Sequence, residues 1–337
     1  MTLFIAIASL FAAFIPMFIY LLLIWWMDRN EREPFWILLL NFVWGATGAI
    51  ILGIIGSIIF QIPLSEGIVF LTGSRSSELI DLSGAIITAP VVEETTKGIF
   101  LVMMSLTRKF DGVVDGVVYG GAIGLGFGMT ENFLYFISYG TDLQSWFLLV
   151  IIRTMFSAVM HCMSQATLGG FIGYAKFKPA VFKFILIPVG LFIAMLLHFT
   201  WNLTVSFEDT SLLGMAFLAI YTLSIIALFQ IALYLEGRTI TKELHEESSI
   251  GIIPSEHLNY LPYVSKRKRY GWCPQGVNQK DYIETSVQLA LRKHQYKNTK
   301  GKTQKSYLVD VENLRYKIQM MFYNANVKYY QTLGKQQ

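Results

Sequence analysis

Long apolar runs separated by short polar breaks dominate the first 236 residues of the chain. A helix needs about 20 apolar residues to cross the hydrocarbon core of a bilayer. Seven runs reach that length: 3–27, 35–60, 84–107, 112–138, 145–174, 180–206 and 211–236. We therefore predict an all-α fold, a polytopic bundle of about seven transmembrane helices.

Polar and turn-forming residues fill the breaks, and the longest predicted break is Gln61–Leu82. The first run, Leu3–Met27, is too long for the apolar core of a signal peptide. It also lacks a basic segment before it and a small-residue cleavage site after it. We expect it to be a retained span.

Basic residues are unevenly shared among the six predicted loops, and cytoplasmic loops carry the excess of Lys and Arg. The second, fourth and sixth loops contain Arg75 as their one basic residue. The first, third and fifth loops, with their edges, contain Arg29, Arg32, Arg108, Lys109, Lys176, Lys178 and Lys183. This asymmetry predicts an outside N-terminus and an inside C-terminus, in a multi-pass protein of the plasma membrane.

Composition divides the chain in two. The whole sequence is 54% hydrophobic and 15% charged, whereas soluble domains carry about 25% charged residues. The deficit lies in residues 1–236, the predicted transmembrane domain, and residues 237–337 form a polar and basic cytoplasmic tail. Apolar spacing within the tail predicts two helices, Asp281–His294 and Ser306–Tyr330.

The most basic stretch of the tail is Lys266-Arg267-Lys268-Arg269. Such a run is typical of nucleic-acid contacts or of attraction to anionic lipids. For a segment on the cytoplasmic membrane face the lipid bilayer is the simpler partner, so we expect anionic lipids and no nucleic acid to meet it. We find no catalytic pattern in the tail.

Ionisable side chains recur inside four consecutive predicted spans, although charges at membrane depth are costly and face the bundle interior or a water-filled cavity. Residues four apart lie on one helix face, which groups Glu93 with Lys97 and His198 with Asn202. The full set is Glu93, Glu94, Lys97, Glu131, Arg153, His161, His198 and Asn202. We predict that these residues share one cavity in the outer half of the membrane.

Three kinds of hydrolytic chemistry suit these residue types. Buried carboxylates and histidines can activate water as acids and bases, two histidines and a glutamate can hold a catalytic zinc ion, and His198 with Asn202 could donate to an oxyanion. The chain has no G-x-S-x-G serine motif and no H-E-x-x-H zinc motif. Its glycine-rich stretch, 116–128, lies inside a span and predicts close helix packing rather than a ligand-binding loop.

Three ordered motifs resemble the PrsW family of bacterial intramembrane proteases: Glu93-Glu94-x-x-Lys97, Phe127-x-x-x-Glu131 and His198-x-x-x-Asn202. Asp115-Gly116 before the second motif also fits, and the similarity covers roughly residues 10–205. The family is related to the CAAX-processing and bacteriocin-processing membrane proteases. The resemblance implies an endopeptidase in the bacterial cell membrane that cuts single-pass proteins, such as anti-sigma factors, near the outer face.

The resemblance also implies a catalytic set: Glu93, Glu94, Glu131, His161, His198 and Asn202. In the expected roles, Glu93 is the general base and Glu94 its partner carboxylate. Glu131 and His161 hold the water, while His198 and Asn202 stabilise the oxyanion. Lys97 and Arg153 balance the negative charge.

The resemblance leaves the catalytic type open, because the family has been described both as metalloproteases and as glutamic proteases. If zinc is bound, Glu94, His161 and His198 are its expected ligands. Asn202 stands where the family motif is often written with Asp, and an amide is not an anionic metal ligand. On that ground we favour the glutamic mechanism, without a cofactor.

Two other functions fit part of the pattern. An ion- or proton-coupled transporter also places carboxylates and histidines at membrane depth, although its expected internal repeat with broken helices is not evident in the sequence. A membrane scaffold that signals through its tail would use Glu93 and Glu94 only as structural ion-pair partners.

Overall fold

A computed structural model of the protein describes residues 2–333. The last four residues of the predicted tail, 334–337, lie outside the described residues. All regular elements among the described residues are helical, which confirms the all-α prediction. The chain forms two compact units, Met1–Met27 with Glu33–Phe229 and Asp28–Arg32 with Gln230–Gln337.

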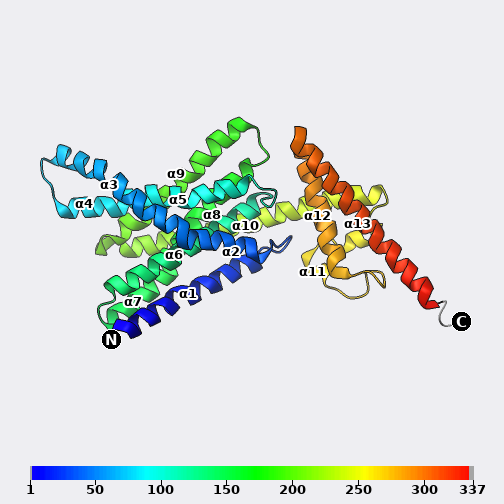
Figure 1. The fold of residues 1–337 in the computed structure, drawn as a ribbon, viewed down its shortest axis with the longest axis horizontal. Coiled ribbons are helices and arrows are strands. Elements are labelled where there is room, and N and C mark those ends of the chain that lie inside the picture. The colour runs from blue at the N-terminus through cyan, green and yellow to red at the C-terminus, as the bar shows by residue number, and fades with distance from the viewer. Residues whose placement is uncertain (1, 334–337) are drawn as a thin grey trace. The chain divides into compact units, whose positions relative to one another are not determined.

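The first unit contains helices that repeatedly join end to end (Figure 1). Three short π-helical turns, η1 (Gly45–Ala49), η2 (Gly84–Thr88) and η3 (Arg153–Ser157), each link two α-helices into one rod. The α-helices are α1 (Thr2–Met27), α2 (Phe35–Trp44), α3 (Ile50–Thr72), α4 (Ser77–Ser83), α5 (Ala89–Ser105), α6 (Val113–Tyr139), α7 (Leu143–Ile152), α8 (Ala158–Ala175), α9 (Ala180–Val205) and the first part of α10 (Glu208–Ser249).

Six of the helical rods are long and apolar enough to cross a membrane. They coincide with six of the seven predicted spans and confirm a polytopic helix bundle. The remaining predicted span, 84–107, is helical over η2 and α5 but carries Glu93, Glu94 and Lys97. Its crossing of the membrane and the predicted orientation stay predictions.

The predicted break at Gln61 is wrong, because α3 continues through Gln61 and Pro63 to Thr72. The polar side chain of Gln61 does not end the helix because its Nε2 donates to the carbonyl of Ile80 at 2.9 Å. The helix ends instead at Gly73, which adopts a left-handed conformation with φ of 69°, as is common for a helix C-cap.

Close packing of α6 on α8 forms the centre of the first unit. A Cβ atom added at Gly120 would lie 2.1 Å from the carbonyl oxygen of Gln165, and one added at Gly124 would lie 2.2 Å from that of His161. No side chain larger than hydrogen fits at such distances. The glycine-rich stretch therefore packs helices, as predicted, and it fixes α8 at two polar residues, His161 and Gln165.

The second unit is a small helical domain with its own apolar core. It combines the end of α10 with α11 (Val264–Arg267), α12 (Gln279–Asn298) and α13 (Gly301–Leu333), and α12 and α13 cross in Figure 1. Its core includes Leu244, Leu289 and Ile318. The two predicted tail helices are confirmed, each with longer bounds than the apolar spacing indicated.

One residue of the basic run in the tail is structural. Arg267 is 6% exposed, and its guanidinium donates to the carbonyl oxygens of Leu261 at 2.5 Å and Asn30 at 2.8 Å. Burial lowers the pKa of Arg267 to about 10. The exposed part of the basic run is thus smaller than its sequence suggests, and lipid attraction to it stays a prediction.

Candidate active site

Five of the six predicted catalytic residues meet inside the first unit. Glu93 and Glu94 come from α5, Glu131 from α6, His161 from α8 and His198 from α9. The rings of His161 and His198 lie edge to face, with centroids 4.9 Å apart. Four helices therefore supply one cluster, as the spacing of charged residues predicted.

Glu94 is completely buried, and donors engage both of its carboxylate oxygens. Oε1 lies 2.6 Å from Lys97 Nζ and 2.8 Å from His198 Nδ1. Oε2 accepts a hydrogen bond of 2.7 Å from Gln165 Nε2. This carboxylate holds its neighbours in place and has no oxygen to spare for a substrate.

Gln165 was missed by the sequence analysis. It is fully buried on α8 and also donates to the backbone carbonyl of Glu94 at 3.1 Å. Gln165 lies four residues after His161, so both side chains are expected on one face of the helix. This spacing could have predicted that Gln165 joins the cluster.

Glu131 lies between a cation and a histidine. Its Oε2 is 2.9 Å from Arg153 NH2 and 2.6 Å from His161 Nε2. Asn132 accepts a hydrogen bond of 3.0 Å from Arg153 Nε, and the guanidinium stacks 3.6 Å from the Tyr135 ring centroid. Arg153 is therefore fixed against Glu131, which fits its predicted charge-balancing role.

The partners of the two histidines define their proton positions. Lys97 Nζ lies 3.0 Å from His161 Nδ1, and because an ammonium group can only donate, Nδ1 accepts. His161 then donates from Nε2 to Glu131. His198 donates from Nδ1 to Glu94, so in the neutral imidazole its Nε2 carries a lone pair.

Glu93 differs from the other two glutamates. Its Oε2 is buried and accepts no hydrogen bond from the described residues. Lys97 Nζ lies 3.7 Å from this oxygen and His198 Nε2 lies 4.0 Å from it. Two acceptors that face each other across 4.0 Å suit a water molecule that donates to both, or a cation.

Asn202 does not join the cluster, although it is one turn after His198. Its Nδ2 donates to the carbonyl oxygen of Ala85, within η2, at 2.8 Å. In this geometry the amide of Asn202 points away from the cluster and does not affect metal binding there. The presence of Asn at this position is therefore no argument against a metal ion.

The contact of Asn202 follows a pattern shared by all three π-helical turns. In η1 the carbonyl of Ala46 accepts from Thr130 Oγ1 at 2.8 Å, and in η3 the carbonyl of Arg153 accepts from Asn132 Nδ2 at 3.4 Å. Two of the three donors flank Glu131, and Asn202 follows His198. Since π turns loosen the regular backbone bonding and are frequent at functional sites, these side chains anchor the helices of the cluster to carbonyl groups of the π turns.

A metal ion could be held by a set that differs from the predicted one. One ligand atom each from Glu93, His161 and His198 lie within 4.8 Å of one another. Two histidines and a glutamate suit zinc, and the unpartnered Oε2 of Glu93 is an available ligand. Glu94 would orient His198 from behind, as carboxylates commonly do for metal-binding histidines.

Comparison with known proteins gives consistent relatives. The family model described as PrsW family intramembrane metalloprotease matches residues 33–231. Protease PrsW of Clostridioides difficile is 29% identical over 56% of this chain and 79% of its own length. Protease PrsW of Oceanobacillus iheyensis is 25% identical over 61% of this chain and 86% of its own length. Protease PrsW of Bacillus subtilis is 28% identical over 33% of this chain and 49% of its own length.

No solved structure matches the chain significantly. The family match extends from before α2 to the last predicted span, and so includes all of the clustered residues. The relatives are bacterial membrane proteases, which favours hydrolysis over transport and agrees with a multi-pass protein of the plasma membrane. The chain belongs to the PrsW family and is an intramembrane protease.

Proposed function

We propose that the chain cleaves single-pass membrane proteins, such as anti-sigma factors, and that Glu93 activates the attacking water. The observation that carries this proposal is the buried Oε2 of Glu93, which accepts no hydrogen bond from the described residues and lies 4.0 Å from His198 Nε2. Glu94 and Glu131 are held by cations and histidines, so Glu93 is the carboxylate best able to take a proton.

The reaction follows from these positions. A water molecule between Glu93 and His198 transfers a proton to Glu93 as its oxygen bonds to the scissile carbonyl carbon. The proton then passes to the amide nitrogen as the C–N bond breaks. General acid–base catalysis of this kind contributes about 10²–10⁴-fold to the rate.

The remaining residues position this pair. Glu94 holds His198 in the tautomer that presents a lone pair to the water, and Gln165 and Lys97 hold Glu94. Glu131 and Arg153 fix His161, whose ring packs against that of His198. In this scheme His198 accepts a hydrogen bond from the water, which replaces the oxyanion role expected from the sequence.

A zinc ion at the same place is a second candidate, favoured by the grouping of Glu93, His161 and His198. When bound, zinc would polarise the scissile carbonyl and acidify the water. His161 would then have to exchange its contact with Glu131 for the ion, and Glu131 would be left as the carboxylate able to accept a proton.

Cleavage of a single-pass substrate in liposomes tests the proposal. Glu93→Gln should reduce the rate by about 10²-fold or more, whereas Glu66→Gln, at an exposed position on α3, should cleave normally. Normal cleavage by Glu93→Gln would overturn the assignment.

Metal analysis separates the two mechanisms. Stoichiometric zinc in the purified wild-type chain, lost in His198→Ala, together with inhibition by a chelator, would establish the zinc mechanism. Full activity of metal-free protein would establish the glutamic one.

A further inference from the structure

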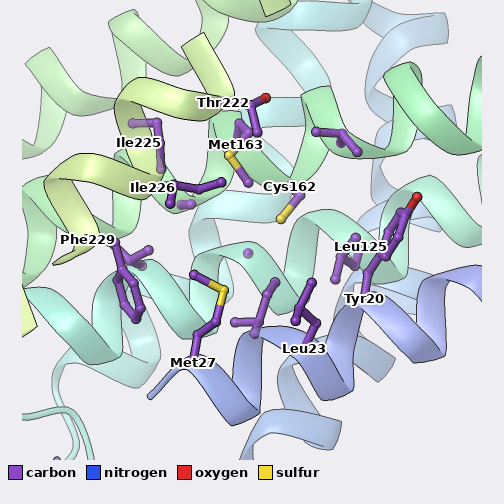
Figure 2. A pocket seen from close by; sticks show the side chains of 15 residues that line it. Tyr20, Leu23, Met27, Leu125, Cys162, Met163, Thr222, Ile225, Ile226 and Phe229 are labelled. Atoms are coloured by element: carbon purple, nitrogen blue, oxygen red, sulfur yellow. The ribbon is translucent and has the colours of Figure 1, made fainter. Parts of the chain in front are cut away.

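The first unit contains a cavity that is separate from the cluster around Glu93 and His198. Its volume is about 300 Å³, and it lies among α1, α6, α8 and α10 (Figure 2). Cys162 and Met163 line it, whereas the adjacent His161 points to the catalytic residues on the other side of α8. The cavity is therefore separate from the protease site.

The four helices line the cavity with regularly spaced residues. The lining positions extend over Tyr20–Met27 on α1, Val117–Leu125 on α6, Val159–Ala166 on α8 and Thr222–Phe229 on α10. Each range covers about two helical turns, which corresponds to a length of about 10 Å. The lining of the cavity therefore extends over about two turns of each of the four helices.

The walls of this cavity are almost entirely hydrocarbon. Hydroxyl or thiol groups occur on three of its fifteen lining residues, Tyr20, Cys162 and Thr222. A buried water molecule needs two to four polar partners, and large apolar cavities stay dry or take apolar ligands. An empty space of this size would cost far more than a typical core truncation, so an apolar occupant is expected.

The cavity continues onto the surface that faces lipid. Two of its lining residues, Leu23 and Ile226, are 49% and 38% exposed. Next to them, Trp26 and Leu223 are large apolar residues with 60% and 67% exposure. In a chain that spans the bilayer, such residues contact acyl chains, so hydrocarbon has direct access to the cavity.

From this geometry we infer a lipid-binding site in which one acyl chain of a membrane phospholipid inserts between α1 and α10 and packs against α6 and α8. The occupant is the acyl chain rather than a substrate helix, because a helix is about 10 Å wide with its side chains and a cavity of about 300 Å³ over two turns is too narrow for it.

Photo-crosslinking of the full-length protein tests this site. The probe is phosphatidylglycerol with a diazirine in one acyl chain, used in nanodiscs, and adducts are mapped by mass spectrometry. We expect adducts on inward-facing residues such as Met163 and Ile225. Adducts confined to outward-facing residues, such as Leu223, would overturn the proposal.

Two filling variants with matched controls test the same site. Ile225→Trp, on the lining face of α10, should abolish the inward adducts, while Leu228→Trp, 59% exposed on the same helix, should keep them. Leu23→Trp and Leu22→Trp form the equivalent pair on α1, for use if Ile225→Trp does not fold. Inward adducts that persist in a folded filling variant, or that a single-pass substrate displaces, would contradict an acyl-chain site.

Discussion

Each unit of the molecule contains a cluster of three glutamates around at least one fully buried carboxylate, and the two clusters are balanced differently. In the second unit, Glu243, Glu246 and Glu247 meet three cations: Lys293, Lys297 and Arg315. In the first unit, Glu93, Glu94 and Glu131 meet two cations, Lys97 and Arg153, and two histidines.

The difference distinguishes a structural cluster from a reactive one. Glu247 is fully buried, and its two oxygens accept from Arg315 at 2.7 and 2.8 Å. In the first unit Glu93 has a buried oxygen that accepts no hydrogen bond from any residue that the structure describes. A cluster that only stabilises a fold seldom leaves a carboxylate oxygen in this state, because an unmade hydrogen bond on a buried group is costly.

The largest effect on stability is expected at Glu94. Glu94→Gln leaves the buried Lys97 ammonium without its closest carboxylate, and removal of one partner of a buried ion pair costs about 3–5 kcal/mol. Denaturation of the purified protein in detergent should show this loss. An unchanged unfolding transition would mean that Glu94 is not the anchor of the cluster.

Glu247→Gln tests whether the glutamate cluster of the second unit has only a structural role. Loss of the charge that meets Arg315 and Lys293 should destabilise the second unit by about 1.5–3 kcal/mol, because Lys293 keeps Glu243 and Glu246 as partners and Arg315 is partly exposed. The loss should be visible as faster hydrogen exchange in α12 and α13. The cleavage rate of the folded variant should equal that of the wild type. A specific loss of catalytic rate would show that the second unit takes part in the reaction.

Gln165→Leu removes one donor to Glu94 at nearly constant volume. We expect a loss of about 1–3 kcal/mol in stability and a lower kcat with an unchanged KM, because His198 is less well oriented. Gln165→Glu is a stricter variant, since a second carboxylate would repel Glu94. Wild-type kcat in both variants would remove Gln165 from the positioning residues.

Asn202→Ala tests the contact with the π turn. Loss of one hydrogen bond to Ala85 should cost about 0.5–1.5 kcal/mol and lower cleavage only modestly. A loss as large as that of Glu93→Gln would instead return Asn202 to the oxyanion role expected from the sequence.

Acid should also weaken the second unit. Hydrogen bonds from Lys297 and Lys293 lower the pKa of Glu246 to about 2. For Glu247, burial alone would raise the pKa, but the bonds from Arg315 and Lys293 outweigh it and lower the pKa. Unfolded glutamate has a pKa of about 4.3, so these groups stabilise the fold above that pH.

The stabilisation is lost as pH falls from about 4 toward 2. Hydrogen exchange in α12 should therefore accelerate across this range. Exchange that is independent of pH, after correction for the intrinsic rate, would contradict the ion-pair network.

Sequence reasoning identified the clustered residues because charges in apolar runs are rare and their spacing places them on helix faces. It failed for Asn202, which lies on the same regular helix as His198 but donates to the carbonyl of Ala85 in a π turn. It also did not find the π turns. Spacing rules assume 3.6 residues per turn, and one inserted residue rotates the following face by about 100°. It also missed Gln165, a neutral residue whose partner, Glu94, lies 71 positions earlier.

Parallel measurement of cleavage rate and unfolding free energy for Glu93→Gln and Glu94→Gln tests the central claim most directly. If Glu93 is the catalytic base, Glu93→Gln loses cleavage by about 10²-fold or more. It should lose less stability than Glu94→Gln, because Glu93 Oε2 accepts no hydrogen bond from the described residues and lies 3.7 Å from Lys97 Nζ. Retained cleavage by Glu93→Gln would contradict the assignment of Glu93 as the base.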